Sequence, residues 1–147
     1  MPDTSLELLG DINRAVIKFR GVYSAWSKRH GISYNEMLVL YTIRDDSFCT
    51  QKGICDCYLL PRQTINNVIT DMRKRGLLVV SPEYCRGREK AFVLTETGTA
   101  YAAPFLDSLN KIETQAVALI GEENIRGMAQ AAAAFSDALE QAMKENA

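Results

Sequence analysis

The sequence predicts a mainly α fold with a small β-wing. Helical apolar stripes occupy both ends of the chain, and the middle reads helix, turn, helix, strand, basic turn, strand. That order is typical of a winged helix-turn-helix flanked by N- and C-terminal helices. We expect a single domain over residues 1–147, with a winged-helix lobe at about 33–95. The flanking helices, at about 4–29 and 98–145, are expected to form a helical dimerisation region.

The N-terminal helix is predicted over about 4–29, because apolar residues recur there at steps of three and four. Gly31 ends it. Ser33 and Glu36 then match a capping box, in which the Ser33 side chain accepts from the Glu36 N–H and the Glu36 carboxylate returns to the Ser33 N–H. A second helix should follow over about 34–45, apolar on all sides and therefore buried between neighbours.

The next two helices and the wing are predicted from their end signals. Thr50 should cap a short helix at about 51–58, and Pro61 suits the first turn of the next one. That fourth helix should end at Lys74-Arg75-Gly76, where cations precede a C-cap glycine. Residues 77–80 and 91–94 are predicted strands, joined by a turn at Arg86-Gly87-Arg88.

Two long helices complete the chain. Thr95 should cap one at about 96–120, which Pro104 is expected to kink, and the last should span about 122–145. Together with the N-terminal helix they carry more apolar surface than a winged helix can cover. A dimer that shares these stripes is the simplest arrangement.

Positive charge is concentrated in one window. The chain has a formal net charge of −1, whereas residues 51–90 hold eight basic and four acidic side chains. A cationic segment in an acidic protein favours an anionic partner, and the phosphates of double-stranded DNA are the default candidate.

The fourth helix has a polar face suited to base contacts. On a helical wheel, Ile65, Val68, Ile69 and Met72 form the core side. The opposite side and its flanks combine amides, hydroxyls and cations: Arg62, Gln63, Thr64, Asn66, Asn67, Thr70, Arg73 and Lys74. Amides bond adenine bidentately and threonine contacts the thymine methyl, so these residues are the DNA-binding candidates. A merely solvated helix face is the alternative, although Glu/Lys pairs are more usual there.

The turn between the strands carries the cations Arg86, Arg88 and Lys90 around Gly87. Charged turns often serve only solubility. Beside such a helix, insertion of these cations into the DNA minor groove is the favoured interpretation.

At this point the sequence resembles the MarR family of transcription regulators. Four segments carry the resemblance: residues 31–40 resemble the opening of the family's second helix, 60–67 the start of its recognition helix, 74–78 its end, and Arg88 with Leu94-Thr95 and Gly98 the end of the wing. The order of elements matches over nearly the whole chain. One departure is Arg86, because the family usually has an aspartate there that orients the wing arginine. We therefore expect a more cationic and less pre-ordered wing.

The resemblance implies a homodimer on a pseudo-palindromic operator, and a crevice for a small-molecule effector between the DNA-binding lobe and the dimerisation helices. Aromatic side chains in the N-terminal third are the candidates for lining that crevice: Phe19, Tyr23, Trp26 and Tyr41. Arg20 or Arg44 would hold an anionic group of the effector. These aromatic residues serve equally well as core.

Four cysteines raise the question of redox or metal sensing. Cys55 and Cys57 point about 200° apart on a helix, so they cannot hold one metal from one face. His30 is the only histidine, and no zinc-ligand spacing occurs, so no metal site is expected. Structural thiols at Cys49, Cys55, Cys57 and Cys85 are the preferred interpretation, and oxidant sensing through one of them is the alternative.

No phosphate loop, nucleophile elbow or metal dyad occurs, so neither enzymatic activity nor a cofactor is expected. The lack of a long apolar run or signal region predicts a cytoplasmic protein without a membrane partner. The preferred function is a DNA-binding transcription regulator, a repressor that responds to a ligand or an oxidant. The rival is a winged-helix protein-interaction module without DNA binding, which the acidic total charge would suit.

Overall fold

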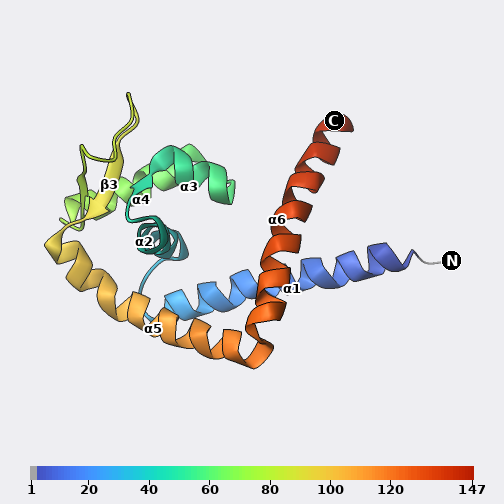
Figure 1. The fold of residues 1–147 in the computed structure, drawn as a ribbon. Helices are drawn as coiled ribbons and strands as arrows, with labels where there is room; N and C mark the ends of the chain where they lie inside the picture. Colours follow the sequence, from blue (N-terminus) through green and yellow to red (C-terminus); the bar gives the residue numbers. More distant parts are fainter. Residues whose placement is uncertain (1–2) are drawn as a thin grey trace. The chain divides into compact units, whose positions relative to one another are not determined.

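The computed structural model describes residues 3–147 and contains six helices and a small sheet within that range (Figure 1). The order is α1 (Thr4–Arg29), α2 (Tyr34–Asp46), β1 (Cys49–Thr50), α3 (Gln51–Tyr58), α4 (Arg62–Lys74), β2 (Leu78–Val80), β3 (Ala91–Leu94), α5 (Glu96–Ile120) and α6 (Glu122–Glu145). Two compact units result, one ending at Leu106 and one covering Asp107–Ala147. This architecture confirms the predicted winged helix-turn-helix.

The helix ends follow the local signals in the sequence. Asp3 caps α1 by accepting from the Ser5 N–H at 2.9 Å, and Gly31 leaves the helix with a φ of +71°. Thr50 caps α3 by accepting from the Gly53 N–H at 2.9 Å. A Cβ on Gly53 would lie 2.8 Å from that same Thr50 oxygen. Glycine is a poor helix former, but at this position its lack of a side chain permits the cap.

The predicted capping box at α2 is half right. The Ser33 Oγ accepts from the Glu36 N–H at 3.1 Å, as expected. The Glu36 carboxylate does not return to Ser33, because its two oxygens bond Arg75 and Tyr101 instead. The Ser33 side chain therefore caps the helix as the motif predicts. The Glu36 carboxylate instead bonds residues that are distant in the sequence.

The helix-turn-helix consists of α3 and α4, which pack on α2. Pro61, with ψ of 140°, is the extended residue before α4 rather than part of its first turn. The helix ends at Lys74, and Gly76 adopts a φ of +75°, as the Lys74-Arg75-Gly76 signal predicts. Ile65, Ile69 and Met72 are buried as expected, whereas Val68 is only half-buried.

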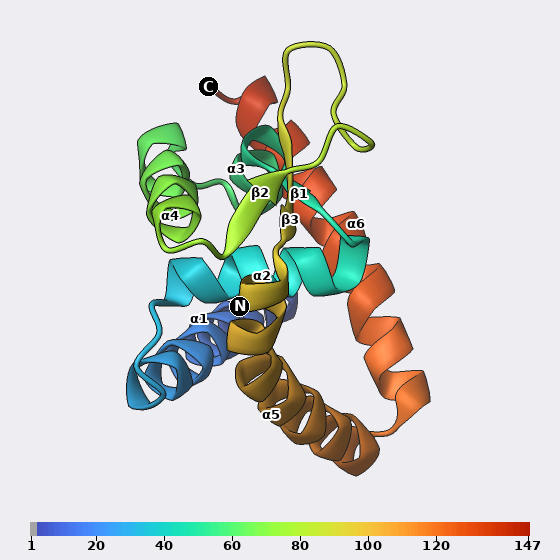
Figure 2. The same ribbon diagram turned by 90° about the vertical axis from the view of Figure 1, so that its left-hand side faces the viewer.

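The sheet has three antiparallel strands in the order β1-β3-β2. The strands β2 and β3 form the predicted hairpin, and their register places Leu78 opposite Leu94 and Val80 opposite Phe92. The strand β1 was not predicted: it has two residues, Cys49 and Thr50, which pair with Phe92 and Ala91. The hairpin between β2 and β3 extends beyond the sheet (Figure 2), and Gly87 at its tip has a φ of +58°.

The start of α5 is hydrogen-bonded to Gly76 and Leu77, which follow α4. Thr95 caps α5 by accepting from the Gly98 N–H at 2.9 Å. Its hydroxyl also donates to the Gly76 carbonyl at 2.6 Å, and its N–H donates to the Leu77 carbonyl at 3.0 Å. Helix α5 continues through Pro104, and the predicted kink there stays a prediction. Among the helices of residues 3–147, none is long and apolar enough to cross a membrane.

Candidate nucleic-acid interface

The outer face of α4 presents polar side chains to solvent. Every DNA-binding candidate from the sequence is exposed except Thr64, which is half-buried. This division follows from the helix period, because buried Ile65, Ile69 and Met72 fix which side of α4 faces the core. The amide and hydroxyl side chains of Gln63, Asn67 and Thr70 therefore occupy the side opposite the core.

Two of these amides are bonded to each other. The Gln63 Nε2 donates to the Asn67 Oδ1 at 2.8 Å, one helical turn apart. The bond leaves the Gln63 carbonyl oxygen as an acceptor and the Asn67 amide nitrogen as a donor. Together the two side chains present the acceptor and donor that a single amide offers to the N6 and N7 edge of adenine.

A groove of about 520 Å³ lies between α3, α4 and the hairpin. Its lining includes the cations Lys52, Arg62, Arg73, Arg88 and Lys90, and the single acid Glu89. Gln51, Asn66 and Thr70 also line it. The structure therefore brings one side of α4, along its length, and the wing cations Arg88 and Lys90 together around one cationic groove.

Neighbouring groups hold two of these cations. The Arg73 guanidinium lies over the Phe92 ring at 5.4 Å from its centroid. The Lys52 ammonium bonds Asp56 at 2.6 Å, and this hydrogen bond raises the pKa of Lys52. Lys52, Gln51 and Glu89 were not among the predicted site residues. Lys52 does fall in the cationic window of the sequence, but only the fold places it beside the wing.

Two predicted cations lie outside this groove. Lys74 lines a separate hollow of about 360 Å³ with Thr70, Arg73 and residues 78–79. The Arg86 Nη1 donates to the carbonyl oxygens of Glu83 at 3.2 Å and Cys85 at 3.0 Å. Arg86 thus braces the backbone of its own hairpin.

Further contacts order the base of the hairpin. The Tyr84 ring stacks on Phe48 with 4.5 Å between centroids. The Cys85 thiol donates to the Ser81 carbonyl at 3.2 Å and accepts from the Ala91 N–H at 3.4 Å. The wing therefore has its own internal supports without the aspartate that usually stands at position 86.

The aromatic residues proposed for an effector have different surroundings. Phe19 is 51% exposed, whereas Trp26 is 7% exposed and stacks on His30 at 4.2 Å. Among the residues that the structure describes, the Trp26 indole N–H meets no hydrogen-bond acceptor. Tyr41 is half-buried beneath the Arg44 guanidinium at 3.9 Å, and Tyr23 is half-buried on α1.

The cysteines of residues 3–147 form no disulfide and differ in exposure. Cys49 and Cys55 are buried, Cys85 is half-buried and Cys57 is exposed. Burial raises the pKa of the Cys49 thiol to about 12, which suppresses the reactive thiolate there. Within residues 3–147, no three side chains of His, Cys, Asp or Glu gather in a metal-binding cluster.

Comparisons with known proteins place this geometry in context. Residues 30–89 match the model of the MarR family. The solved structure of a MarR family regulator from Neisseria meningitidis is 28% identical, with a TM-score of 0.82 over 97% of this chain and 99% of that chain. A comparison with curated protein sequences gives no match.

Two more distant structures share the fold. MarR of Staphylococcus aureus, solved with salicylate and kanamycin, has a TM-score of 0.69 at 16% identity and covers 94% of this chain and 93% of that chain. BpsR of Bordetella bronchiseptica, whose DNA binding 6-hydroxynicotinic acid regulates, has a TM-score of 0.65 at 17% identity, covering 88% and 98%. Residues 30–89 thus carry the sequence pattern of the MarR family, and the chain as a whole has the winged-helix fold of the MarR family regulator from Neisseria meningitidis.

Proposed function

We propose that this protein is a transcription regulator that binds double-stranded DNA sequence-specifically as a homodimer. The observation that carries the proposal is the amide and hydroxyl face of α4 beside a groove lined by five cations. We call α4 the reading helix, because its amides are proposed to contact bases. The cations around it supply phosphate contacts. The polar face of α4 without the cationic groove, or the groove without the polar face, would not support sequence-specific DNA binding.

The proposed DNA-binding residues fall into two classes, those that contact bases and those that contact phosphates. Gln63, Asn67 and Thr70 are proposed to contact base edges in the major groove, with Thr64 and Asn66 beside them. The remaining candidates are proposed to contact the DNA backbone through phosphates: Arg62, Arg73, Lys74, Arg88 and Lys90, with Arg86 supporting the wing. The two classes predict different dependence on sequence and salt.

Replacing Gln63 or Asn67 by alanine should weaken binding to a preferred duplex by about 1–3 kcal/mol and leave binding to random DNA unchanged. Because the two amides bond each other at 2.8 Å, the double variant should lose less than the sum of the single losses. The measurement is fluorescence anisotropy on a duplex selected by the wild-type protein and on a scrambled duplex.

Gln141→Ala is the matched control for those variants. Gln141 is an exposed glutamine whose amide bonds Glu145 at 2.9 Å one turn away, but it lies on α6. Its removal should leave both affinities unchanged. An equal loss on selected and scrambled DNA for Gln63→Ala would contradict base readout.

The dimer is proposed from the apolar side chains of the terminal helices. On α1 the exposed ones are Leu6, Leu8, Ile12, Val16, Ile17, Phe19 and Val22. The unit over Asp107–Ala147 exposes Ile112, Val117, Leu119, Ile120, Met128, Phe135, Leu139 and Met143. Apolar surface of this extent marks an interface, and closed symmetric pairs are the commonest solution.

Light scattering after size exclusion should therefore give roughly twice the chain mass of 16.4 kDa. Ile17→Lys, on the 70% exposed side chain of α1, should weaken the dimer because it places a charge in the proposed interface. Leu59→Lys is the control, since Leu59 is 82% exposed but belongs to the turn between α3 and α4. A monomer at micromolar wild-type protein would contradict the proposal.

We also propose that the regulator is a repressor whose DNA binding responds to a small molecule. The similar structures solved with salicylate, or described as regulated by 6-hydroxynicotinic acid, support a carboxylate-bearing aromatic compound. Phe19, Tyr23, Trp26 and Tyr41 remain the proposed ligand residues, with Arg20 or Arg44 near the carboxylate. The unpartnered indole N–H of Trp26 supports a hydrogen-bond acceptor in that ligand. Oxidant sensing through Cys49 has less support, because burial raises the pKa of that thiol.

A further inference from the structure

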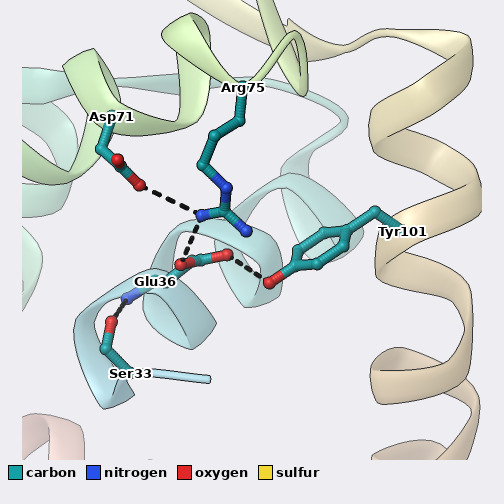
Figure 3. A network of polar contacts seen from close by, with 5 residues as sticks. All are labelled: Ser33, Glu36, Asp71, Arg75 and Tyr101. Atoms are coloured by element: carbon teal, nitrogen blue, oxygen red, sulfur yellow. Dashed lines mark hydrogen bonds and ion pairs between the residues drawn. The ribbon is translucent and has the colours of Figure 1, made fainter. Parts of the chain in front are cut away.

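One carboxylate joins the second, fourth and fifth helices at a single point. The Glu36 Oε2 accepts from the Arg75 Nη1 at 3.1 Å, and the Glu36 Oε1 accepts from the Tyr101 hydroxyl at 2.7 Å (Figure 3). Glu36 lies in the first turn of α2, Arg75 is the C-cap residue directly after α4, and Tyr101 lies on α5. The partners are 39 and 65 residues from Glu36 along the chain, so this contact fixes tertiary geometry.

Both oxygens of the Glu36 carboxylate are hydrogen-bonded. The Glu36 side chain is only 10% exposed, and it lies at the positive end of the α2 dipole. Burial first, and then the hydrogen bond to Glu36, raises the pKa of Tyr101, so its hydroxyl remains a donor. Both carboxylate oxygens therefore have a charge-assisted or hydroxyl partner, as a buried acid requires.

Arg75 connects this point to the reading helix. Its Nη1 also bonds Asp71 of α4 at 3.1 Å, and its guanidinium lies 5.1 Å from the centre of the Tyr101 ring. The residues directly after it are held as well, since Thr95, which precedes α5, donates to the carbonyl oxygens of Gly76 and Leu77. The C-terminal end of α4 is thus held from α2 and α5 by directional bonds.

The apolar core alone would leave this end less defined. Ile65, Ile69 and Met72 bury one side of α4, but apolar contacts have no preferred direction. An ion pair between a buried carboxylate and an arginine that is 39% exposed adds little stability, whereas its geometry is specific. What the network supplies is therefore orientation of α4 about its axis and along its length.

We propose that Tyr101 is a positioning residue for DNA readout. Through Glu36 and Arg75, its hydroxyl holds α4 in the orientation at which Gln63 and Asn67 meet base edges. Base contacts tolerate displacements of only about 0.5 Å, whereas long Lys and Arg side chains follow a shifted phosphate. Loss of the hydroxyl should therefore reduce discrimination between sequences more than it reduces total affinity. This inference rests on the proposed function.

The test is Tyr101→Phe, which removes one oxygen and keeps the ring that packs on Phe105 at 5.3 Å. A random duplex library selected with the wild-type protein supplies the specific probe, and a scrambled duplex of the same length supplies the non-specific one. The ratio of the two affinities should fall about three- to tenfold. The affinity for the scrambled duplex and the salt slope should not change, because no charge is lost.

Tyr58→Phe is the matched control. Tyr58 is also half-buried, burial also raises its pKa, and its hydroxyl lies 3.3 Å from the Thr42 hydroxyl, but it does not contact α4 through this network. Its loss should leave the affinity ratio as in the wild type. Glu36→Gln, which removes the charge that Arg75 meets, is a second variant and should lower the ratio in the same direction.

The outcomes separate the two claims. A wild-type protein that selects no duplex overturns the proposed function, and this inference with it. A wild-type protein that selects a duplex, with an unchanged ratio in Tyr101→Phe, overturns the positioning role alone. An equal fall in Tyr58→Phe would also overturn it, because loss of any half-buried hydroxyl would then suffice.

Discussion

Gly98→Ala is expected to destabilise the folded protein by at least about 3 kcal/mol, more than most single substitutions. A Cβ on Gly98 would lie 2.0 Å from the Leu77 carbonyl oxygen and 2.9 Å from its carbonyl carbon. The Leu77 carbonyl cannot move aside easily, because its oxygen accepts a hydrogen bond from the Thr95 N–H at 3.0 Å. Relief of the clash would separate α5 from the end of the reading helix.

Two other helical glycines serve as controls for that variant. A Cβ at Gly21 on α1 or at Gly127 on α6 would meet no atom within 4 Å. Alanine at either position should be neutral or stabilising by about 0.5–1 kcal/mol, because alanine is the better helix former. Denaturant unfolding at one fixed protein concentration compares the three variants. A Gly98→Ala protein as stable as the wild type would mean that Leu77 and α5 are not in close contact.

The second large effect concerns the cationic groove. The double variant Arg62→Glu and Arg88→Glu should lower the affinity for selected and scrambled DNA alike by at least about 100-fold at low salt. Both side chains line the groove from opposite sides, α4 and the wing. The dependence of log affinity on log salt should become shallower by about two units, because two phosphate contacts are lost.

Lys18→Glu with Lys111→Glu is the control of equal charge change. Both lysines are exposed, on α1 and α5, and neither lines the groove. This control should keep most of the affinity and the full salt slope, provided that light scattering gives the wild-type mass. If both double variants bind equally weakly, net charge rather than the groove governs DNA binding.

Sequence reasoning succeeded where the signal is local. Ser33, Thr50 and Thr95 each cap the following helix by accepting from the N–H three residues later. Residue type and spacing therefore suffice to predict where these helices start. Gly76 similarly marks the end of α4, where a positive φ is needed. The helix period alone predicted which side of α4 is exposed, and every candidate residue on that helix except Thr64 is exposed.

The missed features depend on contacts between distant segments. The strand β1 has two residues, too few for any periodicity, and exists because β3 pairs with it. The Glu36 carboxylate left its expected local partner for Arg75 and Tyr101, which a capping motif cannot anticipate. Lys52 joins the wing groove, and Gly98 meets Leu77, only once the tertiary fold exists.

The most direct test of the central claim is the binding of the wild-type protein to a selected duplex and a scrambled one over a range of salt. We expect the selected duplex to contain two half-sites about one helical turn apart and to bind at least about 1,000-fold more tightly than the scrambled duplex. Affinity for both should fall steeply with salt. Equal affinity for the two duplexes, or no binding at low salt, would contradict sequence-specific DNA recognition by this protein.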